Sequence, residues 1–396
     1  MPRLSVQAMT LTNAFGTGVA STLAGLKAGS SALTPGNFPG LEFETWIGRI
    51  DGIDGHRLPP RLSDFEARNH RIIDLALDQD GFRFKVSTLI QRFGAHRIGL
   101  ILGTSTSGIL ETEKAYRHRD PLDGNLPDDF RYRERQNTSA PAAFVKALLG
   151  VSGPAWVLST ACSSSSKVFA SAARLLQANW CDAVIVGGSD SLCLTTLYGF
   201  KALDLVAKNP SRPMDQAREG ISIGEGAGFM ILTRDPDPAE GVSLIGYGES
   251  SDAYHMSSPH PEGIGASRAI ENGLQRASLT AEQIDFTLLH GTGTRANDLS
   301  EDRAITRSLG AHTPCASIKG AIGHTLGAAG IMNAVTACLS LREGFLPGTA
   351  HLVTQDPEIH STVLKRPLFK SGRHILTNAF GFGGSNAVLL FGRSTK

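Results

Sequence analysis

The 396-residue sequence lacks the features that mark secreted, membrane or nucleic-acid-binding proteins. Its five cysteines, at 162, 181, 193, 315 and 338, are odd in number and scattered, so they do not form a disulfide framework. No apolar run approaches the length that crosses a bilayer, and the N-terminus lacks the apolar core of a signal peptide. The net charge of +1 gives no general electrostatic case for nucleic acid. We therefore expect reduced thiols, a cytoplasmic location, no membrane span and no nucleic-acid partner.

Motifs for nucleotides and metals are also missing. The glycine-rich stretches "GEGAG" (224–228) and "GTGT" (291–294) do not continue into a dinucleotide fingerprint with a downstream acid, and neither carries a phosphate-loop lysine. His255 and His260 lie in a proline-bearing loop without a helical ligand spacing or a nearby pair of thiols. The sequence therefore predicts no bound metal and no cofactor.

What the chain has in quantity is glycine, 44 residues, at the ends of short apolar runs. The apolar runs are typical of strands buried on both faces, and helix-like stretches alternate with them, which indicates an α/β protein. The strand-like runs are 97–108, 182–191, 286–294 and 374–391, and the helix-like stretches are 166–179, 266–278 and 328–344.

The length suits two domains or one large layered unit. The proline-rich, acidic segment "TRDPDPAEGVS" (233–243) is the best internal boundary, and it predicts two domains, 1–235 and 236–396. The charged stretch "YRHRDPLDGNLPDDFRYRERQN" (116–137) is typical of an exposed insertion, either a solvated loop or the rim of a partner contact.

One cysteine has an unusual setting. Cys162 follows the strand-like "AWVLSTA" (155–161) and precedes a run of four serines that opens a helix-like stretch. A thiol at the start of a helix faces unpaired backbone N–H groups, which typically lower its pKa and make it a nucleophile. The alternative from position alone is an inert buried cysteine.

Two histidines at glycine-lined turns favour the nucleophile. His290 ends "FTLLH", at the carboxyl edge of a predicted strand, where α/β folds place their chemistry. His324 lies in the glycine-rich turn "SIKGAIGHTLGAAG" (317–330), and Lys319 precedes it by five residues. The lysine is a cation that would hold a neighbouring imidazole neutral.

Six stretches in series resemble the signature motifs of the β-ketoacyl-acyl carrier protein synthases, the decarboxylating condensing enzymes of the thiolase fold. They run from about residue 97 to the C-terminus and read "STACSSSS", "SRPMDQAREGISIGEGAGFMIL", "SDAYHMSSPHPEG", "HGTGT", "SIKGAIGHTLGAAG" and "TNAFGFGGSN". The resemblance implies a five-layered αβαβα fold built from two similar halves. It implies an acyl carrier protein as substrate carrier, with acyl and malonyl groups on its phosphopantetheine arm.

The resemblance also implies a role for each motif residue. Cys162 would carry the acyl chain as a thioester, His290 and His324 would stabilise the enolate left by decarboxylation of the malonyl group, and Lys319 would support the two histidines. The backbone N–H groups of Cys162 and Phe380 would form the oxyanion hole, with Phe380 and Gly381 acting as a gate. The hydroxyls of Thr292 and Thr294 would bind the pantetheine arm.

The chain departs from the family pattern in three places, and the first is the serine run after Cys162, which differs from the commoner "ACSSG" form. Asn333 stands where the familiar synthases carry a glutamate as charge partner for the motif lysine, which puts the protonation state of Lys319 in question. Thr106 stands where a bulky aliphatic residue closes the acyl pocket. We therefore hypothesise that long, aromatic or unsaturated chains fit, as in a polyketide or aryl-polyene pathway.

Rival interpretations differ in their nucleophile or base. Thiolases and synthases of the third type replace one histidine by a cysteine or an asparagine, which the pair at 290 and 324 argues against. A chain-length-factor subunit keeps the fold but typically lacks the nucleophile, and Cys162 is present. The resemblance predicts a dimer, either of identical chains or with such a factor, through the strand at 182–188.

Overall fold

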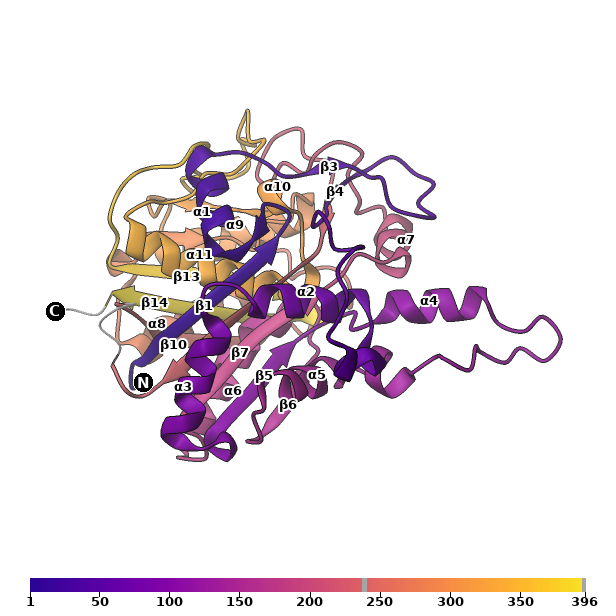
Figure 1. Cartoon of the computed structure of the whole chain (residues 1–396). Coiled ribbons are helices and arrows are strands. Elements are labelled where there is room, and N and C mark those ends of the chain that lie inside the picture. Colours follow the sequence, from indigo (N-terminus) through magenta and orange to yellow (C-terminus); the bar gives the residue numbers. More distant parts are fainter. Residues whose placement is uncertain (237–240, 394–396) are drawn as a thin grey trace.

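The computed structural model describes residues 1–236 and 241–393, and one large sheet runs through it (Figure 1). The first half of the chain contributes five strands in the spatial order β1-β9-β7-β5-β6. Their bounds are β1 (Leu4–Asn13), β5 (Ile98–Gly103), β6 (Ala155–Leu158), β7 (Ala183–Asp190) and β9 (Gly226–Thr233).

The second half contributes five strands in the order β10-β14-β13-β11-β12. Counted along the chain within each half, both sets read 1-5-4-2-3, with two antiparallel pairings followed by two parallel ones. The expected fold from two similar halves is therefore confirmed. The bounds are β10 (Val242–Ser251), β11 (Phe286–Leu288), β12 (Cys315–Ala316), β13 (His374–Gly381) and β14 (Ser385–Arg393).

The two halves join where β1 pairs with β10, at Leu4 with Leu244 and Ser5 with Ser243. Two helices lie between the half-sheets and pack on each other: α6 (Ser164–Gln177) and α11 (Ala329–Glu343). Every residue of α11 from Ala329 to Leu341 is buried, as expected for a helix of small and apolar residues without a polar face. These two helices form the middle layer of the αβαβα arrangement.

The outer layers cover the other faces of the half-sheets. On the first half they are α2 (Arg68–Leu77), α3 (Phe82–Phe93) and α5 (Ala140–Leu149), and on the second half α8 (Ile264–Ala277) and α9 (Arg295–Leu309). The remaining elements are α1 (Gly18–Ala28) packed on β1, α4 (Ile109–Arg117), α7 (Leu194–Ala202), α10 (Lys319–Ile322), the hairpin strand β2 (Gly16–Thr17) and a small sheet of β3 (Thr34–Pro35), β4 (Trp46–Gly48) and β8 (Ile223–Gly224). Short helical turns are η1 (Pro60–Phe65), η2 (Ala95–Arg97), η3 (Tyr132–Gln136), η4 (Ala281–Gln283), η5 (Leu326–Ala328) and η6 (Phe382–Gly384).

Three expectations can be compared with this arrangement. Within the described residues, no helix combines the length and apolar character needed to cross a membrane, and all five cysteines are free. The strand at 182–188 cannot form the dimer contact that we predicted, because β7 is paired on both sides, with β5 and β9. The free edge of the first half is β6, so the predicted dimer strand was wrong. The boundary at 235/236 remains a prediction, and residues 237–240 of the proposed linker lie outside the described residues.

Candidate active site

The turn between β6 and α6 carries the predicted nucleophile, and the serines hold that turn. Ser164 Oγ accepts a hydrogen bond from the Thr160 N–H at 2.9 Å and donates to Ala161 O at 2.6 Å. Ser163 Oγ donates to Thr160 O at 2.8 Å. Ala161 has a φ of +51°, a left-handed conformation that a residue with a Cβ rarely adopts. The serine run therefore fixes a strained turn, and Cys162 lies at its end, just before the helix begins.

The end of β13 presses directly on this turn. A Cβ built on Gly381 would lie 2.8 Å from Thr160 O, which is closer than real Cβ contacts allow, and a tight 3.2 Å from the N and the Oγ of Ser163. Glycine at 381 is thus required for close approach of the second half of the chain to the nucleophile turn. This contact is how the "FGFGG" segment reaches the cysteine.

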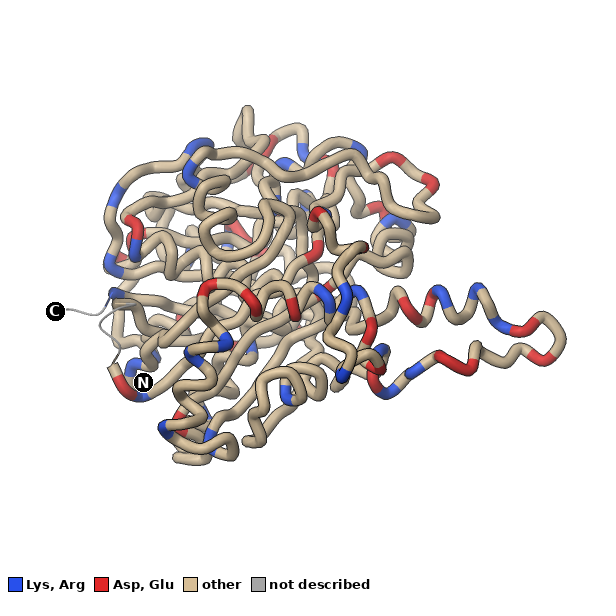
Figure 2. The backbone as a smooth tube through the Cα atoms, in the orientation of Figure 1, with Lys and Arg blue, Asp and Glu red and all other residues tan. Residues whose placement is uncertain are grey.

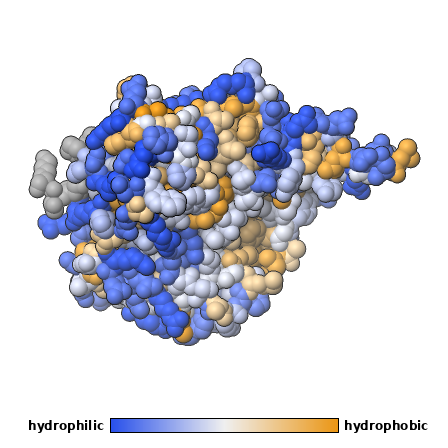
Figure 3. Space-filling model, turned by 90° about the horizontal axis from the view of Figure 1, so that it is seen from below, coloured by the Kyte–Doolittle hydropathy of each residue, from blue (hydrophilic) through white to orange (hydrophobic). Residues whose placement is uncertain are grey.

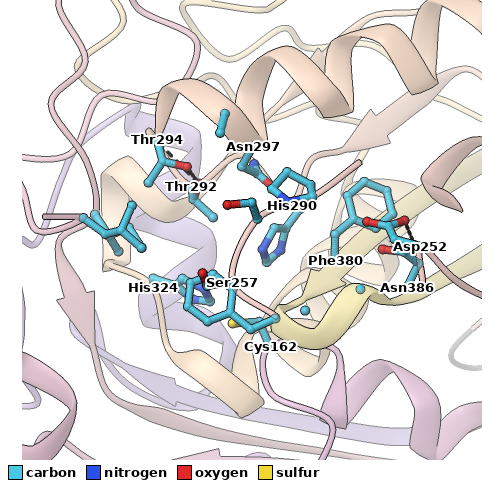
Figure 4. A pocket seen from close by; sticks show the side chains of 18 of the residues that line it. Cys162, Asp252, Ser257, His290, Thr292, Thr294, Asn297, His324, Phe380 and Asn386 are labelled. Atoms are coloured by element: carbon cyan, nitrogen blue, oxygen red, sulfur yellow. Dashed lines mark hydrogen bonds between the residues drawn. The ribbon is translucent and has the colours of Figure 1, made fainter. Parts of the chain in front are cut away.

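Both predicted histidines reach the cysteine from the second half of the chain. A ring nitrogen of His290, a ring nitrogen of His324 and the Cys162 Sγ all lie within 4.8 Å of one another, and all three residues are buried. The two imidazole rings are edge-on, with centroids 5.4 Å apart. Figure 4 shows the three side chains converging at one end of a pocket. A cysteine and two histidines that lie 128 and 162 positions after it in the sequence therefore form one cluster.

Hydrogen bonds on the far side of each ring settle which nitrogen carries the proton. The backbone N–H of Leu326 donates to His324 Nδ1 at 3.1 Å, so that nitrogen is an acceptor. Lys319 Nζ lies 3.5 Å from His290 Nδ1 and also donates to the His290 carbonyl. Burial, and next the charge of Lys319, hold the pKa of both histidines well below 6.5. Each ring is therefore neutral, and its proton is on Nε2.

This tautomer also bears on metal binding. A cysteine and two histidines at this spacing form a donor set that zinc uses elsewhere. A metal requires a lone pair on each ligating nitrogen, whereas both Nε2 atoms carry protons and the Lys319 ammonium lies beside one ring. The group is built to donate hydrogen bonds.

The electrostatics of the sulfur differ from our expectation. Burial raises the pKa of the Cys162 thiol to about 11; the nearby Lys319 charge lowers it, Asp190 raises it further, and the N–H groups of Cys162 and Phe382 lower it. The expected depression of this pKa was wrong, because loss of water around the sulfur outweighs the cation and the backbone donors. The free protein holds a thiol, and its proton must leave the sulfur during acyl transfer.

The backbone donor of the oxyanion hole and the gate, which we expected at Phe380, belong to Phe382 instead. Apart from its own N–H, the backbone donor at the Cys162 sulfur is that of Phe382. Phe380 lies inside β13, 8% exposed, with its ring 6.0 Å from that of His290. Phe382 is half-buried and packs on Phe200 at 5.6 Å between centroids. Phe380 is therefore a packing residue, and we transfer both proposed roles to Phe382.

The backbone of His290 is held between two opposite charges. The side chain of Glu301, from α9, accepts the His290 N–H at 2.7 Å and the Gly291 N–H at 2.6 Å, while Lys319 donates to the His290 carbonyl. Burial raises the pKa of Glu301 to about 7 and lowers that of Lys319 to about 8. Sequence analysis missed Glu301; its only signal was an acid eleven residues after the motif histidine.

Asn333 does not replace the missing charge. Its Nδ2 donates to the carbonyls of Leu289 at 3.0 Å and Asn378 at 3.3 Å, so the side chain joins the end of β11 to the middle of β13. Within the described residues, no carboxylate lies within 4.0 Å of the Lys319 ammonium. The largest effect of a negative charge on the pKa of Lys319 is that of Glu301, across the His290 peptide.

A second buried acid, also missed by the sequence analysis, organises the loop before α4. Asp190, at the end of β7, accepts hydrogen bonds from the hydroxyl groups of residues 104–106, from the N–H groups of residues 105 and 106, and from the Gly327 N–H at 2.6 Å. The Thr106 hydroxyl is one of these donors, at 2.7 Å, so it is turned toward Asp190. Asp190 thus ties the predicted acyl-pocket residue to the turn that carries His324.

The cluster lies at one end of a pocket of about 670 Å³ of empty volume, open space at its mouth included. Thr292 and Thr294 line it, with their hydroxyls 2.9 Å apart, as expected of residues that would meet a pantetheine arm. Thr106 is not among its lining residues. The lining also includes Phe200, Leu205, Asp252, Ser257, Asn297, Phe382 and Asn386.

Residues 85–237 match the family described as "Beta-ketoacyl synthase, N-terminal domain", and residues 242–353 match "Beta-ketoacyl synthase, C-terminal domain". The chain belongs to the β-ketoacyl synthase family. It is similar to Nodulation protein E of Rhizobium meliloti (strain 1021), 34% identical over 307 residues, which cover 75% of this chain and 76% of that one. It is equally similar, 34% over 317 residues, to 3-oxoacyl-[acyl-carrier-protein] synthase 2 of the same strain, covering 75% and 74%.

Among solved structures, this β-ketoacyl synthase resembles the ketosynthase ApeO in complex with its chain length factor ApeC from Xenorhabdus doucetiae. The identity is 34%, the TM-score is 0.89, and the match covers 99% of this chain and 98% of the other. The family and the fold agree with the sequence-based expectation. The protein is a condensing enzyme of the acyltransferase class.

Proposed function

We propose that the protein is a 3-oxoacyl-acyl carrier protein synthase that joins a cysteine-bound acyl chain to a malonyl unit with loss of carbon dioxide. The observation that carries the proposal is the cluster of one thiol and two Nε2–H donors within 4.8 Å, at the end of a pocket that Thr292 and Thr294 line. Decarboxylation needs donors aimed at a developing oxyanion, and these neutral imidazoles supply them without a metal.

Acyl transfer comes first. As the sulfur of Cys162 attacks the acyl thioester, the carbonyl oxygen becomes an oxyanion that accepts hydrogen bonds from the N–H groups of Cys162 and Phe382. Because both Nε2 atoms already carry protons, the proton of the Cys162 thiol passes to the sulfur of the carrier arm, the carbon–sulfur bond to that arm breaks, and the arm leaves as a thiol. The histidines stay neutral, and the acyl group is on the cysteine.

Condensation follows in the same pocket. The thioester carbonyl of the malonyl group accepts hydrogen bonds from Nε2 of His290 and His324, and the carbon–carboxylate bond breaks to release carbon dioxide and an enolate. The enolate carbon attacks the acyl-cysteine, the tetrahedral oxyanion uses the same backbone donors, and the cysteine sulfur leaves as a thiolate and takes up a proton from solvent. The product is a β-ketoacyl chain, two carbons longer, on the carrier protein.

The acyl chain that we propose is long, aromatic or unsaturated. Thr106 replaces a bulky aliphatic residue, and its hydroxyl is tied to Asp190, so this position presents little apolar bulk. Turnover of saturated and conjugated acyl-carrier substrates of equal length tests this directly. A clear preference for saturated medium chains contradicts it.

We propose an acyl carrier protein as the substrate carrier and a thiolase-fold subunit, identical or of the chain-length-factor type, as the partner. The named relatives support both, and the free edge of β6 offers a strand for pairing between subunits. A cytoplasmic location fits the five free cysteines.

The competing function is a non-catalytic chain-length-factor subunit. Cys162 and both histidines in one cluster argue against it. Incubation with acyl- and malonyl-carrier protein, followed by mass analysis of the carrier-bound product, tests the proposal; cerulenin labelling and peptide mapping test the nucleophile. A chain that forms no extended product and is not modified at Cys162 is the partner subunit.

A further inference from the structure

Asp190 is the one charged residue in the five strands of the first half-sheet, all of which the structure describes. Elsewhere the charges lie mostly in the helices and loops around the strands (Figure 2), and hydrophilic residues cover much of the face shown in Figure 3. Asp190 is instead fully buried, at the end of β7. A buried carboxylate is costly unless its hydrogen bonds are satisfied, so its donors show which parts of the chain it holds.

The donors to Asp190 come from two segments that lie far apart in the sequence. Three hydroxyls and two N–H groups belong to residues 104–106, after β5, and one further N–H is that of Gly327, in the turn that carries His324. Within the part of the chain that the structure describes, Asp190 forms no ion pair. Its charge is therefore stabilised by neutral donors, and the loss of any of them leaves the carboxylate poorly solvated.

The two segments also touch each other. A Cβ built on Gly327 would lie 2.7 Å from Asp190 Oδ2 and 2.7 Å from the Ser105 N, closer than real Cβ contacts allow. Glycine at 327 thus permits the His324 turn to lie directly on the loop at residues 104–106. Because the turn and the loop are in contact and share one carboxylate, a displacement of the loop also moves the turn.

The start of α6, which follows the nucleophile, is packed into the same place. A Cβ on Gly103 would lie 2.4 Å from the Ser165 N, and one on Gly330 would lie 2.5 Å from the Ser166 N. Ser165 Oγ accepts the N–H of Ile331 at 2.9 Å, near the start of α11. The end of β5, the start of α6 and the start of α11 are therefore too close to move independently of one another.

His324 depends on its turn for its tautomer. The Leu326 N–H donates to His324 Nδ1 at 3.1 Å, which leaves the ring proton on Nε2. Leu326 has a φ of +52°, a left-handed conformation that a residue with a Cβ keeps only where its surroundings determine it. The next N–H along the chain, that of Gly327, is the one that Asp190 accepts. Asp190 therefore holds the strained residue that sets the tautomer of His324.

The charge of Asp190 also acts on the nucleophile. Burial is the largest cause of the raised pKa of Cys162, the Lys319 charge opposes it, and the Asp190 charge adds to it. This effect depends on the charge of the carboxylate and not on its shape. Asp190 thus has one effect through hydrogen bonds and a second through charge, and the two can be measured separately.

We propose that Asp190 is a positioning residue that couples the loop at residues 104–106, on the acyl side of the site, to His324, on the decarboxylating side. Its carboxylate holds Leu326, the Leu326 N–H holds Nδ1 of His324, and Nε2 keeps the proton that stabilises the enolate. Thr106 shares the same carboxylate, so an acyl chain that displaces this loop also disturbs His324 and slows decarboxylation. The proposal rests on the proposed function for the reaction that His324 serves.

A double-mutant cycle tests the coupling. Thr106→Val removes one hydroxyl from Asp190 with little change of shape, and Asp190→Asn removes the charge. We expect kcat for decarboxylation of malonyl-carrier protein to fall roughly threefold with Thr106→Val and roughly tenfold or more with Asp190→Asn, with KM changed less than about twofold. In the Asp190→Asn background, Thr106→Val should have no further effect. Two effects that simply multiply would refute the coupling.

The tautomer of His324 gives a readout that a general loss of stability does not produce. NMR of protein labelled with ¹⁵N-histidine distinguishes a protonated from an unprotonated ring nitrogen, and the His324→Ala spectrum assigns the signals. The wild type should carry the His324 proton on Nε2, and Asp190→Asn should show a mixture of both tautomers. A His324 that stays fully in the Nε2–H form in Asp190→Asn contradicts the proposal.

Charge and shape are separated at Cys162. At about pH 8, Asp190→Asn should raise the rate of alkylation by iodoacetamide roughly three- to tenfold. Asp190→Glu keeps the charge but lengthens the side chain, so it should alkylate like the wild type and still decarboxylate slowly. Faster alkylation in both variants would show only a loosened site and would overturn the proposal. The matched control is Asp182→Asn, just before the other end of β7, where the carboxylate pairs with Arg97 and Arg234; it should leave all three readouts unchanged.

Thermal unfolding checks the folding of each variant. If Asp190→Asn does not fold, Thr104→Val and Ser105→Ala, which each remove one hydroxyl donor, take its place and should lower kcat for decarboxylation at constant KM. A wild type that does not decarboxylate malonyl-carrier protein refutes the proposed function, while the His324 tautomer and the alkylation rate still test Asp190. Normal decarboxylation with an unchanged tautomer in Asp190→Asn refutes the role of Asp190 alone.

Discussion

At the scale of single residues, the chemistry depends on neutral groups whose protons are placed by their neighbours. The thiol of Cys162 has a pKa of about 11, and both histidines have pKa values held well below 6.5. Burial is the largest cause in all three cases. A free thiol next to two neutral imidazoles is therefore the resting state, and acyl transfer moves the thiol proton to the departing carrier sulfur.

Resting Cys162 should alkylate slowly at neutral pH. Because its pKa is about 11, the thiolate fraction, and with it the rate of reaction with iodoacetamide, should rise about tenfold for each pH unit between 7 and 10. Intact-mass measurement of alkylation against pH checks this. A rate that is already flat above pH 8 would show a depressed pKa and contradict our account of the sulfur.

Replacing Cys162 should separate the two half-reactions. Cys162→Ala and Cys162→Gln both remove the nucleophile and should abolish elongation. The glutamine amide resembles an acylated sulfur, so Cys162→Gln should still decarboxylate malonyl-carrier protein, which carbon dioxide release reports. Elongation by either variant would refute the assignment of Cys162.

Glu301 should act by positioning His290. Glu301→Gln loses a charged acceptor for two backbone N–H groups, and one such bond contributes about 1.5–3 kcal/mol, so kcat for decarboxylation should fall roughly 10- to 100-fold with KM nearly unchanged. The wild-type rate should rise near pH 7, as Glu301 ionises, and fall near pH 8, as Lys319 loses its proton.

In the Glu301→Gln variant, the rise of the decarboxylation rate near pH 7 should disappear, because no carboxylate ionises there. Asn333→Glu places a carboxylate at the position where the familiar synthases carry a glutamate. In the double variant with Glu301→Gln, this carboxylate should recover part of the decarboxylation rate. A pH profile unchanged by Glu301→Gln would limit this residue to a structural role.

At the scale of elements, the site exists because β13 ends against the turn between β6 and α6. Gly381→Ala would place a methyl group 2.8 Å from Thr160 O, so we expect a loss of about 1–3 kcal/mol of stability and strongly reduced acyl loading. Thermal unfolding and loading of Cys162 measure the two effects. Gly199→Ala in α7 meets nothing within 4 Å and should keep or slightly raise the Tm, which makes it the control. Equal behaviour of the two variants would remove the argument for close approach.

Element order explains which predictions succeeded. The strand-end histidines and the cysteine before a helix could be predicted because glycine-rich turns after apolar runs are visible in the sequence. The dimer strand could not, because the 1-5-4-2-3 order places β7 inside and β6 at the edge, and neither strand's own residues reveal this. Phe380 and Phe382 were confused because "FGFGG" offers two phenylalanines, and only the end of β13 separates the packed one from the one beside the sulfur.

Buried acids were the other limit of the sequence. Glu301 and Asp190 are read from sequence as ordinary surface acids, since nothing local shows that they are buried and accept several backbone N–H groups. The direction of the Cys162 pKa shift could not be predicted from the sequence either, because the burial of the sulfur results from the contact between the two halves.

At the scale of the whole molecule, a repeated half supplies the two parts of one reaction. The first half contributes the thiol at the end of its third strand, and the second half contributes both imidazoles and the backbone donor of Phe382. Neither half alone holds the acyl chain and the developing enolate together. The packing of α6 on α11, which joins the two half-sheets, therefore brings the parts of the active site together.

The central claim is that these groups act as one condensing centre, and a single-turnover chase tests it most directly. The acyl-enzyme is formed with acyl-carrier protein, isolated and mapped by peptide mass, then mixed with malonyl-carrier protein. We predict that the acyl group leaves Cys162 and appears on the carrier protein two carbons longer, with one equivalent of carbon dioxide released. An acyl group on another residue, or one that stays on Cys162 while malonyl-carrier protein is consumed, would contradict the account.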